Sequence, residues 1–91
     1  MSRVINIKRG HPLKEASNYV YVGRPTKWGN PFIVGKDGTR EEVIVKYRDW
    51  LHQQPNLIAE AKKELRGMVL GCYCKPLPCH ADVLLQIAND L

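Results

Sequence analysis

The chain of 91 residues is long enough for one domain with a single small hydrophobic core. Hydrophobic residues make up 44% of it, an ordinary fraction for a globular protein, which argues against intrinsic disorder. No segment approaches the ~20 apolar residues of a membrane-spanning helix, and the first residues lack the apolar core of a signal peptide. We therefore expect a cytoplasmic protein without a membrane partner.

The net charge of +5 is concentrated near the N-terminus. Residues 1–39 contain seven Lys or Arg and two acidic residues, whereas residues 40–91 contain seven of each kind. This excess of positive charge favours an anionic partner such as a phosphate, a nucleotide or a nucleic acid. A solvated basic face that only improves solubility would explain the same pattern.

Four short segments predict strands, and three longer ones predict helices. The predicted strands are Val4–Ile7, Tyr19–Val22, Phe32–Val34 and Met68–Cys72. The first helix runs from a capping box of Thr39 and Glu42 to just before Pro55, where the second begins. The third covers about residues 79–90. The pattern predicts a small single α/β domain over residues 1–91, with a mixed sheet of about four short strands and three helices.

The ends of the predicted strands indicate where a site should lie. If the strands run parallel, their carboxyl ends share one edge of the sheet, where open α/β sheets bind ligands. The segments that leave the strands at this edge would be residues 8–11, 23–30 and 72–80. They contain most of the chemically interesting side chains, so we expect the functional site there.

The loop of residues 23–31 reads Gly-Arg-Pro-Thr-Lys-Trp-Gly-Asn-Pro and cannot form a regular strand or helix. It nevertheless combines two cations with a large aromatic residue. We predict that Arg24 and Lys27, together with Arg40 of the following helix, neutralise a phosphate and that Trp28 stacks on a ring. A lid in which Trp28 packs over the core is the alternative.

Residues 70–80, Leu-Gly-Cys-Tyr-Cys-Lys-Pro-Leu-Pro-Cys-His, hold all three cysteines between a predicted strand and the start of a helix. Backbone N–H groups at a helix start lack partners within the helix and attract an anion or a thiolate. The segment therefore predicts a site, and three kinds of site remain open.

A zinc site is the first possibility, and it would make the domain a zinc-stabilised nucleic-acid-binding module. Its ligands would be Cys72, Cys74, Cys79 and His80, which are suitable by type. Their spacing, C-x-C-x4-C-H, is not that of the usual zinc knuckle.

A cysteine-dependent enzyme that acts on a nucleotide or nucleoside derivative is the second possibility. Cys79 lies at a helix start beside His80, with Lys75 nearby, and each feature favours a thiolate. Neighbouring residues of a helix do not face each other, so His80 is not the obvious base for Cys79. His11 could take that role if the strand ends meet.

The third possibility is binding of a small anionic, nucleotide-like ligand in a basic pocket at the sheet edge, without a cofactor. The expected ligand-binding residues are Arg9, Gly23, Arg24, Thr26, Lys27, Trp28, Gly29, Asn30, Arg40, Cys72, Tyr73, Cys74, Lys75, Pro76, Cys79 and His80. We favour this function because it uses most of these features and requires no special geometry. The excess of basic residues is small, so we expect weak or no binding to nucleic acid. For Cys72 or Cys74, a structural place in the core is the alternative.

Two long motifs resemble a known family. Residues 21–32, Tyr-Val-Gly-Arg-Pro-Thr-Lys-Trp-Gly-Asn-Pro-Phe, and residues 65–80 are similar to the uncharacterised family catalogued as domain of unknown function 4326. Residues 38–42 and 47–51 fit its middle segment, and Tyr73 stands where the family often has Trp. The resemblance implies a bacterial or phage protein and no established activity. Some small phage proteins with basic pockets sequester a host signalling nucleotide, which suggests such a ligand by analogy.

Overall fold

The computed structural model of the chain describes residues 3–8, 10–73 and 77–90. Its elements, in chain order, are β1 (Arg3–Asn6), the short 3-10 helix η1 (Pro12–Glu15), β2 (Tyr19–Tyr21), α1 (Arg40–His52), α2 (Pro55–Glu64), β3 (Val69–Cys72) and α3 (His80–Asn89). The predicted small α/β domain is thus confirmed, with its three predicted helices. None of the helices in the described part is long and apolar enough to cross a membrane.

The strands of the described residues form one sheet in the order β1-β3-β2, and β3 pairs in parallel with both neighbours. The sheet therefore differs from the prediction, which was a mixed sheet of about four strands. The parallel ladders continue beyond the strand ends, because Ile7 donates its N–H to the Cys72 carbonyl at 3.0 Å and Val22 donates to Gly71 at 3.1 Å. The carboxyl ends of all three strands consequently lie at one edge, as expected for parallel strands.

The segment Phe32–Val34, which was predicted as a strand, makes only an isolated bridge between Val34 and Gly38. Side chains occupy the backbone donors that a sheet would need. The N–H of Phe32 donates to Asn30 Oδ1 at 2.9 Å, and the N–H of Ile33 donates to Asp37 Oδ2 at 2.8 Å. Asn and Asp often compete with a sheet in this way, so the segment becomes part of a loop.

The predicted start of α1 is confirmed. The Thr39 hydroxyl accepts the N–H of Glu42 at 3.2 Å, and the Glu42 carboxylate accepts the N–H of Thr39 at 2.9 Å. These two bonds form the reciprocal capping box that the sequence predicts. The helix buries Val43, Tyr47 and Leu51, which recur at helical spacing and form its core-facing stripe.

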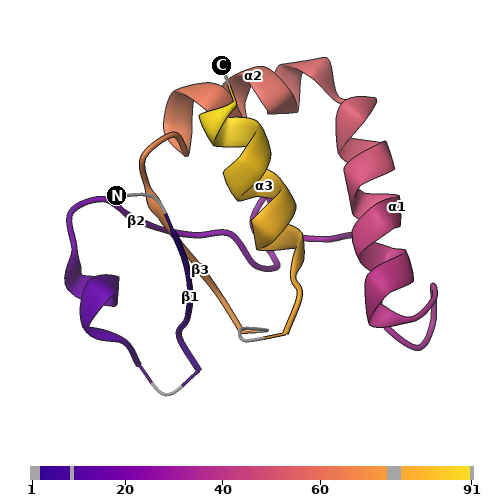
Figure 1. Cartoon of the computed structure of the whole chain (residues 1–91), viewed down its shortest axis with the longest axis horizontal. Coiled ribbons are helices and arrows are strands. Elements are labelled where there is room, and N and C mark those ends of the chain that lie inside the picture. Colours follow the sequence, from indigo (N-terminus) through magenta and orange to yellow (C-terminus); the bar gives the residue numbers. More distant parts are fainter. Residues whose placement is uncertain (1–2, 9, 74–76, 91) are drawn as a thin grey trace.

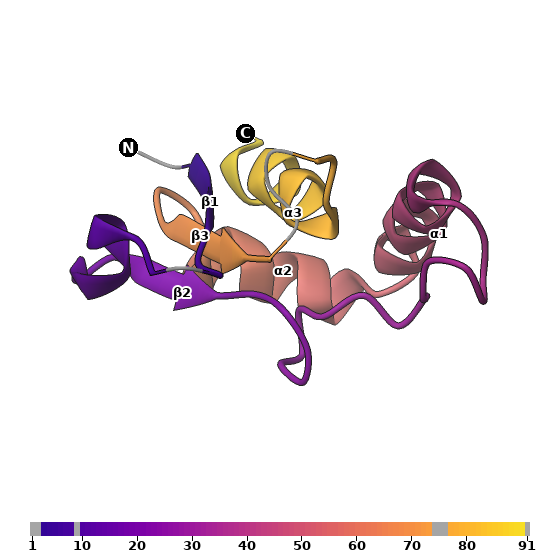
Figure 2. The same ribbon diagram turned by 90° about the horizontal axis from the view of Figure 1, so that it is seen from below.

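The three helices lie at increasing distance from the sheet, with α3 nearest and α1 farthest (Figures 1 and 2). Helix α3 packs against β1 and β3, α2 packs against α3, and α1 packs against α2 and α3 at the far side of the molecule. The main core lies between the sheet and the helices and includes the fully buried Val22, Leu65, Leu70 and Leu84. The segment between β2 and α1 contacts the starts of both α3 and α1, through His80 and Val43 respectively.

Candidate functional site

A cavity of about 200 Å³ opens at the carboxyl ends of β2 and β3. It is bounded by the loop after β2, the first turns of α1 and the start of α3. Residues of the predicted ligand-binding set that line it are Gly23, Arg24, Asn30, Arg40, Cys72, Tyr73, Cys79 and His80. Segments that are distant in the sequence thus meet at the predicted edge of the sheet.

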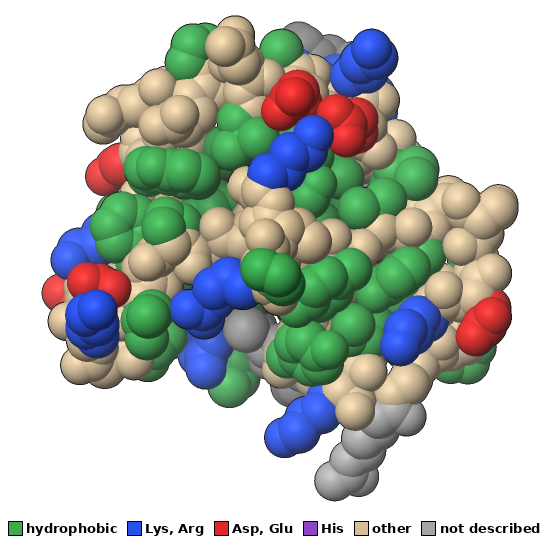
Figure 3. Space-filling view, turned by 180° about the vertical axis from the view of Figure 1, so that it is seen from behind, with side chains coloured by type: hydrophobic (Ala, Val, Ile, Leu, Met, Phe, Trp, Pro, Cys, Tyr) green, Lys and Arg blue, Asp and Glu red, His purple; other side chains and the backbone are tan. Residues whose placement is uncertain are grey.

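Two arginines from different elements contribute the charge of this cavity. Arg24 comes from the loop after β2, and Arg40 is the first residue of α1. Within the described residues neither guanidinium forms an ion pair with a carboxylate, and Arg40 donates only a long 3.5 Å hydrogen bond to the Pro78 carbonyl. Lys and Arg side chains also gather in the lower half of the face shown in Figure 3, with hydrophobic side chains between them.

The backbone beside Arg24 depends on two glycines. A Cβ atom on Gly29 would lie 2.8 Å from Cγ of Arg24, and one on Gly23 would overlap the Tyr21 ring. The Tyr21 ring covers Gly23 because its hydroxyl donates to the Arg24 carbonyl at 2.9 Å. Any side chain at either glycine would therefore displace a wall of the cavity.

Aromatic rings form another wall. Tyr21 and Tyr73 meet edge to face, with ring centroids 5.8 Å apart, and Phe32 also lines the cavity. Tyr73 is 57% exposed, so its ring is accessible to a ligand. Aromatic faces in such a position can stack on a planar ring.

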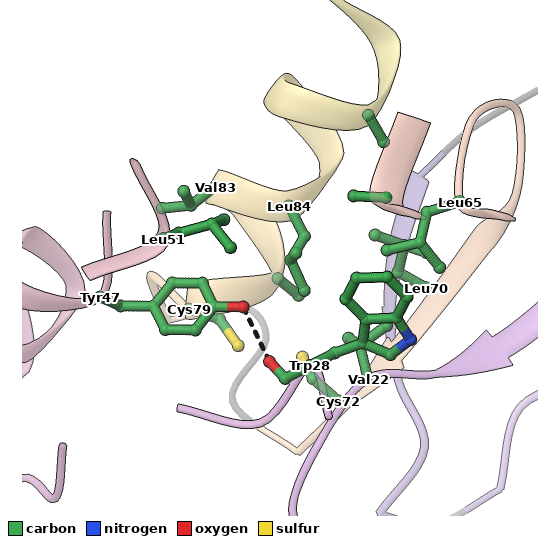
Figure 4. Packing of buried hydrophobic residues seen from close by; sticks show 13 residues of the cluster. Val22, Trp28, Tyr47, Leu51, Leu65, Leu70, Cys72, Cys79, Val83 and Leu84 are labelled. Carbon is green, nitrogen blue, oxygen red and sulfur yellow. Dashed lines mark hydrogen bonds between the residues drawn. The ribbon is translucent and has the colours of Figure 1, made fainter. Parts of the chain in front are cut away.

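Trp28, for which we predicted stacking on a ligand, lies elsewhere. Its side chain is 3% exposed and belongs to the main core, and it does not line the cavity. Its carbonyl accepts the Tyr47 hydroxyl of α1 at 2.8 Å (Figure 4). The loop therefore anchors itself by burying the indole, which is the arrangement of the alternative, a lid over the core.

Lys27 also points away from the predicted site. Its amine lies 3.1 Å from a Glu64 oxygen and 3.6 Å from a Glu60 oxygen, both on α2. It also lies 4.8 Å from the centroid of the Trp28 ring. The charge of Lys27 is thus matched by carboxylates that the sequence places more than thirty residues away.

Three further predicted residues support the loop. The Thr26 hydroxyl donates to the Gly23 carbonyl at 2.6 Å and accepts the N–H of Trp28 at 3.3 Å. The Asn30 amide donates to the Val43 carbonyl of α1 at 3.2 Å while its oxygen accepts from Phe32. Both side chains are therefore engaged with backbone, and together with Gly29 they position the cavity wall.

His80 is held in a defined orientation at the start of α3. Its Nε2 lies 2.8 Å from the Val22 carbonyl oxygen. A carbonyl can only accept, so Nε2 carries the proton and the neutral ring keeps a lone pair on Nδ1. Burial lowers the pKa of His80, and the charge of Arg24 acts in the same direction, so the neutral form is favoured. The Tyr47 ring and the imidazole pack edge to face, with their ring centroids 5.2 Å apart.

The Nδ1 atom of His80 lies 3.4 Å from Sγ of Cys79. This contact corrects the expectation that adjacent residues could not face each other. Cys79 is the N-cap of α3, with an extended backbone at φ −146° and ψ 154°, so it is not inside the helix. Its sulfur takes the position of a Ser or Thr cap, and its N–H donates to the Asp82 carboxylate at 3.0 Å. Cys79 and Cys72 both lie at the edge of the buried cluster (Figure 4).

Several predicted residues are not brought to the cavity, or lie outside the described part of the chain. His11 caps η1, where its Nδ1 accepts the N–H of Leu13 at 3.0 Å, and it does not line the cavity. The members of the predicted set that lie outside the described ranges are Arg9, Cys74, Lys75 and Pro76. Among the described residues, no group of three or more His, Cys, Asp or Glu could hold a metal ion. The predicted zinc set includes Cys74 and so remains a prediction.

The cavity also contains residues that sequence reasoning did not select, namely Tyr21, Phe32, Val34, Val43, Ile44 and Pro78. Tyr21 could have been found, because it ends a strand immediately before the Gly23 loop. Phe32 directly follows that loop and could have been found in the same way. Val43 and Ile44 carry no chemical signal beyond their place near the start of α1.

Comparison with known proteins gives two matches. The family model described as Domain of unknown function (DUF4326) matches residues 5–90. An Enterobacteria phage T4 protein, described as an uncharacterized 12.4 kDa protein in the nrdA-td intergenic region, is 46% identical over 76 residues. That alignment covers 79% of this chain and 68% of the phage protein. No solved structure matches the chain.

Proposed function

Starting from the finding that the chain belongs to the family described as Domain of unknown function (DUF4326), we propose that it binds a small anionic, nucleotide-like ligand in the cavity between β2, α1 and α3. We expect the protein to bind this ligand in the cytoplasm. A protein that binds it without altering it would act by sequestration, and a signalling nucleotide is a suitable target for that role.

The observation that carries this proposal is the position of Arg24 and Arg40. Both line one small cavity, and neither is neutralised by a carboxylate of the described residues. The start of α3 opens onto the same cavity through Cys79 and His80. A helix N-terminus carries partial positive charge, so this feature and the two arginines all favour a phosphate.

The aromatic wall supports a nucleotide over inorganic phosphate. Phe32 and Tyr73 offer ring faces beside the two arginines, and Tyr73 is 57% exposed. The volume of about 200 Å³ is below the ~300–1,000 Å³ of pockets for drug-sized ligands. We therefore expect the cavity to take the phosphate and part of a mononucleotide, with the remainder over the exposed Tyr73 ring.

Isothermal titration calorimetry with a panel of linear and cyclic nucleoside monophosphates tests the proposal, with the matching nucleosides as controls. Replacement of Arg24 or Arg40 by Ala should remove one charge-assisted hydrogen bond to the phosphate. Such a bond contributes ~1.5–3 kcal/mol, so the affinity should fall about 10- to 150-fold. Cys79→Ser should weaken binding by less than about tenfold, since it keeps the backbone donors of the helix start.

Lys27→Ala is the matched control, because it removes the same charge from the same loop outside the cavity. It should leave the affinity nearly unchanged. The proposal fails if no nucleotide binds more tightly than its nucleoside. It also fails if Lys27→Ala weakens binding as much as Arg24→Ala.

A further inference from the structure

We propose that Cys79 and His80 form a nucleophile–base pair that makes a covalent bond to an electrophilic carbon of an anionic ligand in this cavity. The inference rests on the proposed function for the position of the ligand, because Arg24 and Arg40 would hold its anionic group. It goes further by assigning chemistry to the site.

The geometry has the three parts of an activated nucleophile. The nucleophile and the base are within hydrogen-bonding reach, since Sγ of Cys79 lies 3.4 Å from Nδ1 of His80. A third group orients the base, because the Val22 carbonyl holds Nε2–H at 2.8 Å and leaves the Nδ1 lone pair toward the sulfur. This chain of nucleophile, base and orienting acceptor is the arrangement found in enzymes that use a thiol or hydroxyl nucleophile.

The start of α3 adds electrostatic support. The sulfur sits at the N-cap, where the partial positive charge of the helix stabilises a thiolate. Asp82 is the carboxylate of α3 nearest to this sulfur along the helix. It accepts a hydrogen bond from the backbone N–H of Cys79 at 3.0 Å. Arg24 lines the same cavity and adds a full positive charge.

The proposed step is balanced without an oxidant or a reductant. The thiol proton moves from Sγ of Cys79 to Nδ1 of His80, and the sulfur electron pair forms a bond to the ligand carbon. The bond between that carbon and its leaving group breaks, and the leaving group takes the bonding electron pair. The proton on His80 can then neutralise the leaving group, which restores the neutral imidazole.

Access to the sulfur is through the cavity. Cys79 is 2% exposed, yet it lines the cavity beside Arg24 and Arg40. A reagent must therefore be small to reach the sulfur, and a negative charge on the reagent should favour its entry. Iodoacetate and iodoacetamide test both requirements, since they have nearly the same size and the same leaving group but differ in charge.

The experiment measures alkylation of the intact protein at pH 7, with tandem mass spectrometry to separate Cys79 from the other two cysteines. Glutathione supplies the reference for a free thiol. We expect the ratio of the iodoacetate rate to the iodoacetamide rate at Cys79 to exceed that of glutathione by about tenfold or more. Arg40→Ala should lower this ratio, whereas Lys27→Ala should not.

His80→Gln isolates the base. A glutamine amide can place its N–H near the position of Nε2 and keep the bond to Val22, but it offers no lone pair in place of Nδ1. Alkylation of Cys79 by both reagents should fall at least about tenfold at pH 7. Circular dichroism of the variant shows whether the fold is kept, and the wild-type rate ratio provides a test that needs no His80 variant.

The inference is overturned if wild-type Cys79 reacts no faster than glutathione with either reagent, or if Arg40→Ala leaves the rate ratio unchanged. That outcome does not touch nucleotide binding, which calorimetry measures separately. Conversely, Cys79 could react fast and selectively with the anionic reagent in a protein that binds no nucleotide. That result would support the proposed nucleophile and refute the proposal of nucleotide binding.

Discussion

The Tyr47 hydroxyl of α1 donates a hydrogen bond to the Trp28 carbonyl and so holds the loop of residues 23–31 against α1. The substitution Tyr47→Phe tests this contact. Tyr47 is 0% exposed and the two atoms are 2.8 Å apart. The substitution keeps the ring and its packing, so the loss is confined to the hydroxyl. A buried carbonyl left without its donor costs ~1–3 kcal/mol, and we expect the free energy of unfolding to fall by that amount.

Urea denaturation followed by circular dichroism measures this change. With a slope of ~1–3 kcal/mol per molar urea, the midpoint should fall by about 1 M. Tyr73→Phe is the matched control, since its ring is 57% exposed. It should change the unfolding free energy by less than ~0.5 kcal/mol. Equal midpoints for wild type and Tyr47→Phe would refute the role of this bond in holding the loop.

Two further predictions concern stability. Burial lowers the pKa of His80 below its ordinary value of 6.5, so the unfolded chain binds the proton more readily. The unfolding free energy should therefore decrease as the pH falls through about 6.5, and His80→Gln should flatten this part of a series of urea midpoints; an unchanged slope would contradict the buried neutral imidazole. A Cβ atom on Gly71 in the central strand would overlap the Tyr19 ring. Gly71→Ala should thus cost ~1–3 kcal/mol and lower the melting temperature by several degrees in calorimetry, whereas an equal or higher melting temperature would show that the ring moves aside freely.

Local signals predicted most of the elements. The capping box of Thr39 and Glu42 and the helix start at Pro55 are fixed by neighbours in the sequence, and both are confirmed. Gly67, shortly after the end of α2, has the left-handed conformation that is common at helix ends, with φ at 75°. From the sequence, parallel strands are only a condition for a shared edge. The strands do pair in parallel, and Arg24 and Cys79 line one cavity at that edge.

The side-chain positions that were not predicted from the sequence depend mainly on interactions with distant parts of the chain. Lys27 has its partners on α2, and Trp28 is placed by a hydroxyl on α1, so neither orientation can be read from the loop itself. The strand expected at Phe32–Val34 was lost to nearby side chains that bond its N–H groups. The contact between Cys79 and His80 depends on one residue lying just outside the helix, and sequence patterns place helix ends only to within one or two residues.

A crystal structure of the complex with the nucleotide that binds most tightly in calorimetry would test the central claim most directly. We predict that its phosphate lies within hydrogen-bonding distance of the Arg24 and Arg40 guanidinium groups at the start of α3. Its base or sugar should contact the ring of Tyr73 or Phe32. A phosphate bound to another basic surface, such as Lys62 and Lys63 at the end of α2, with this cavity unchanged, would contradict the proposed site.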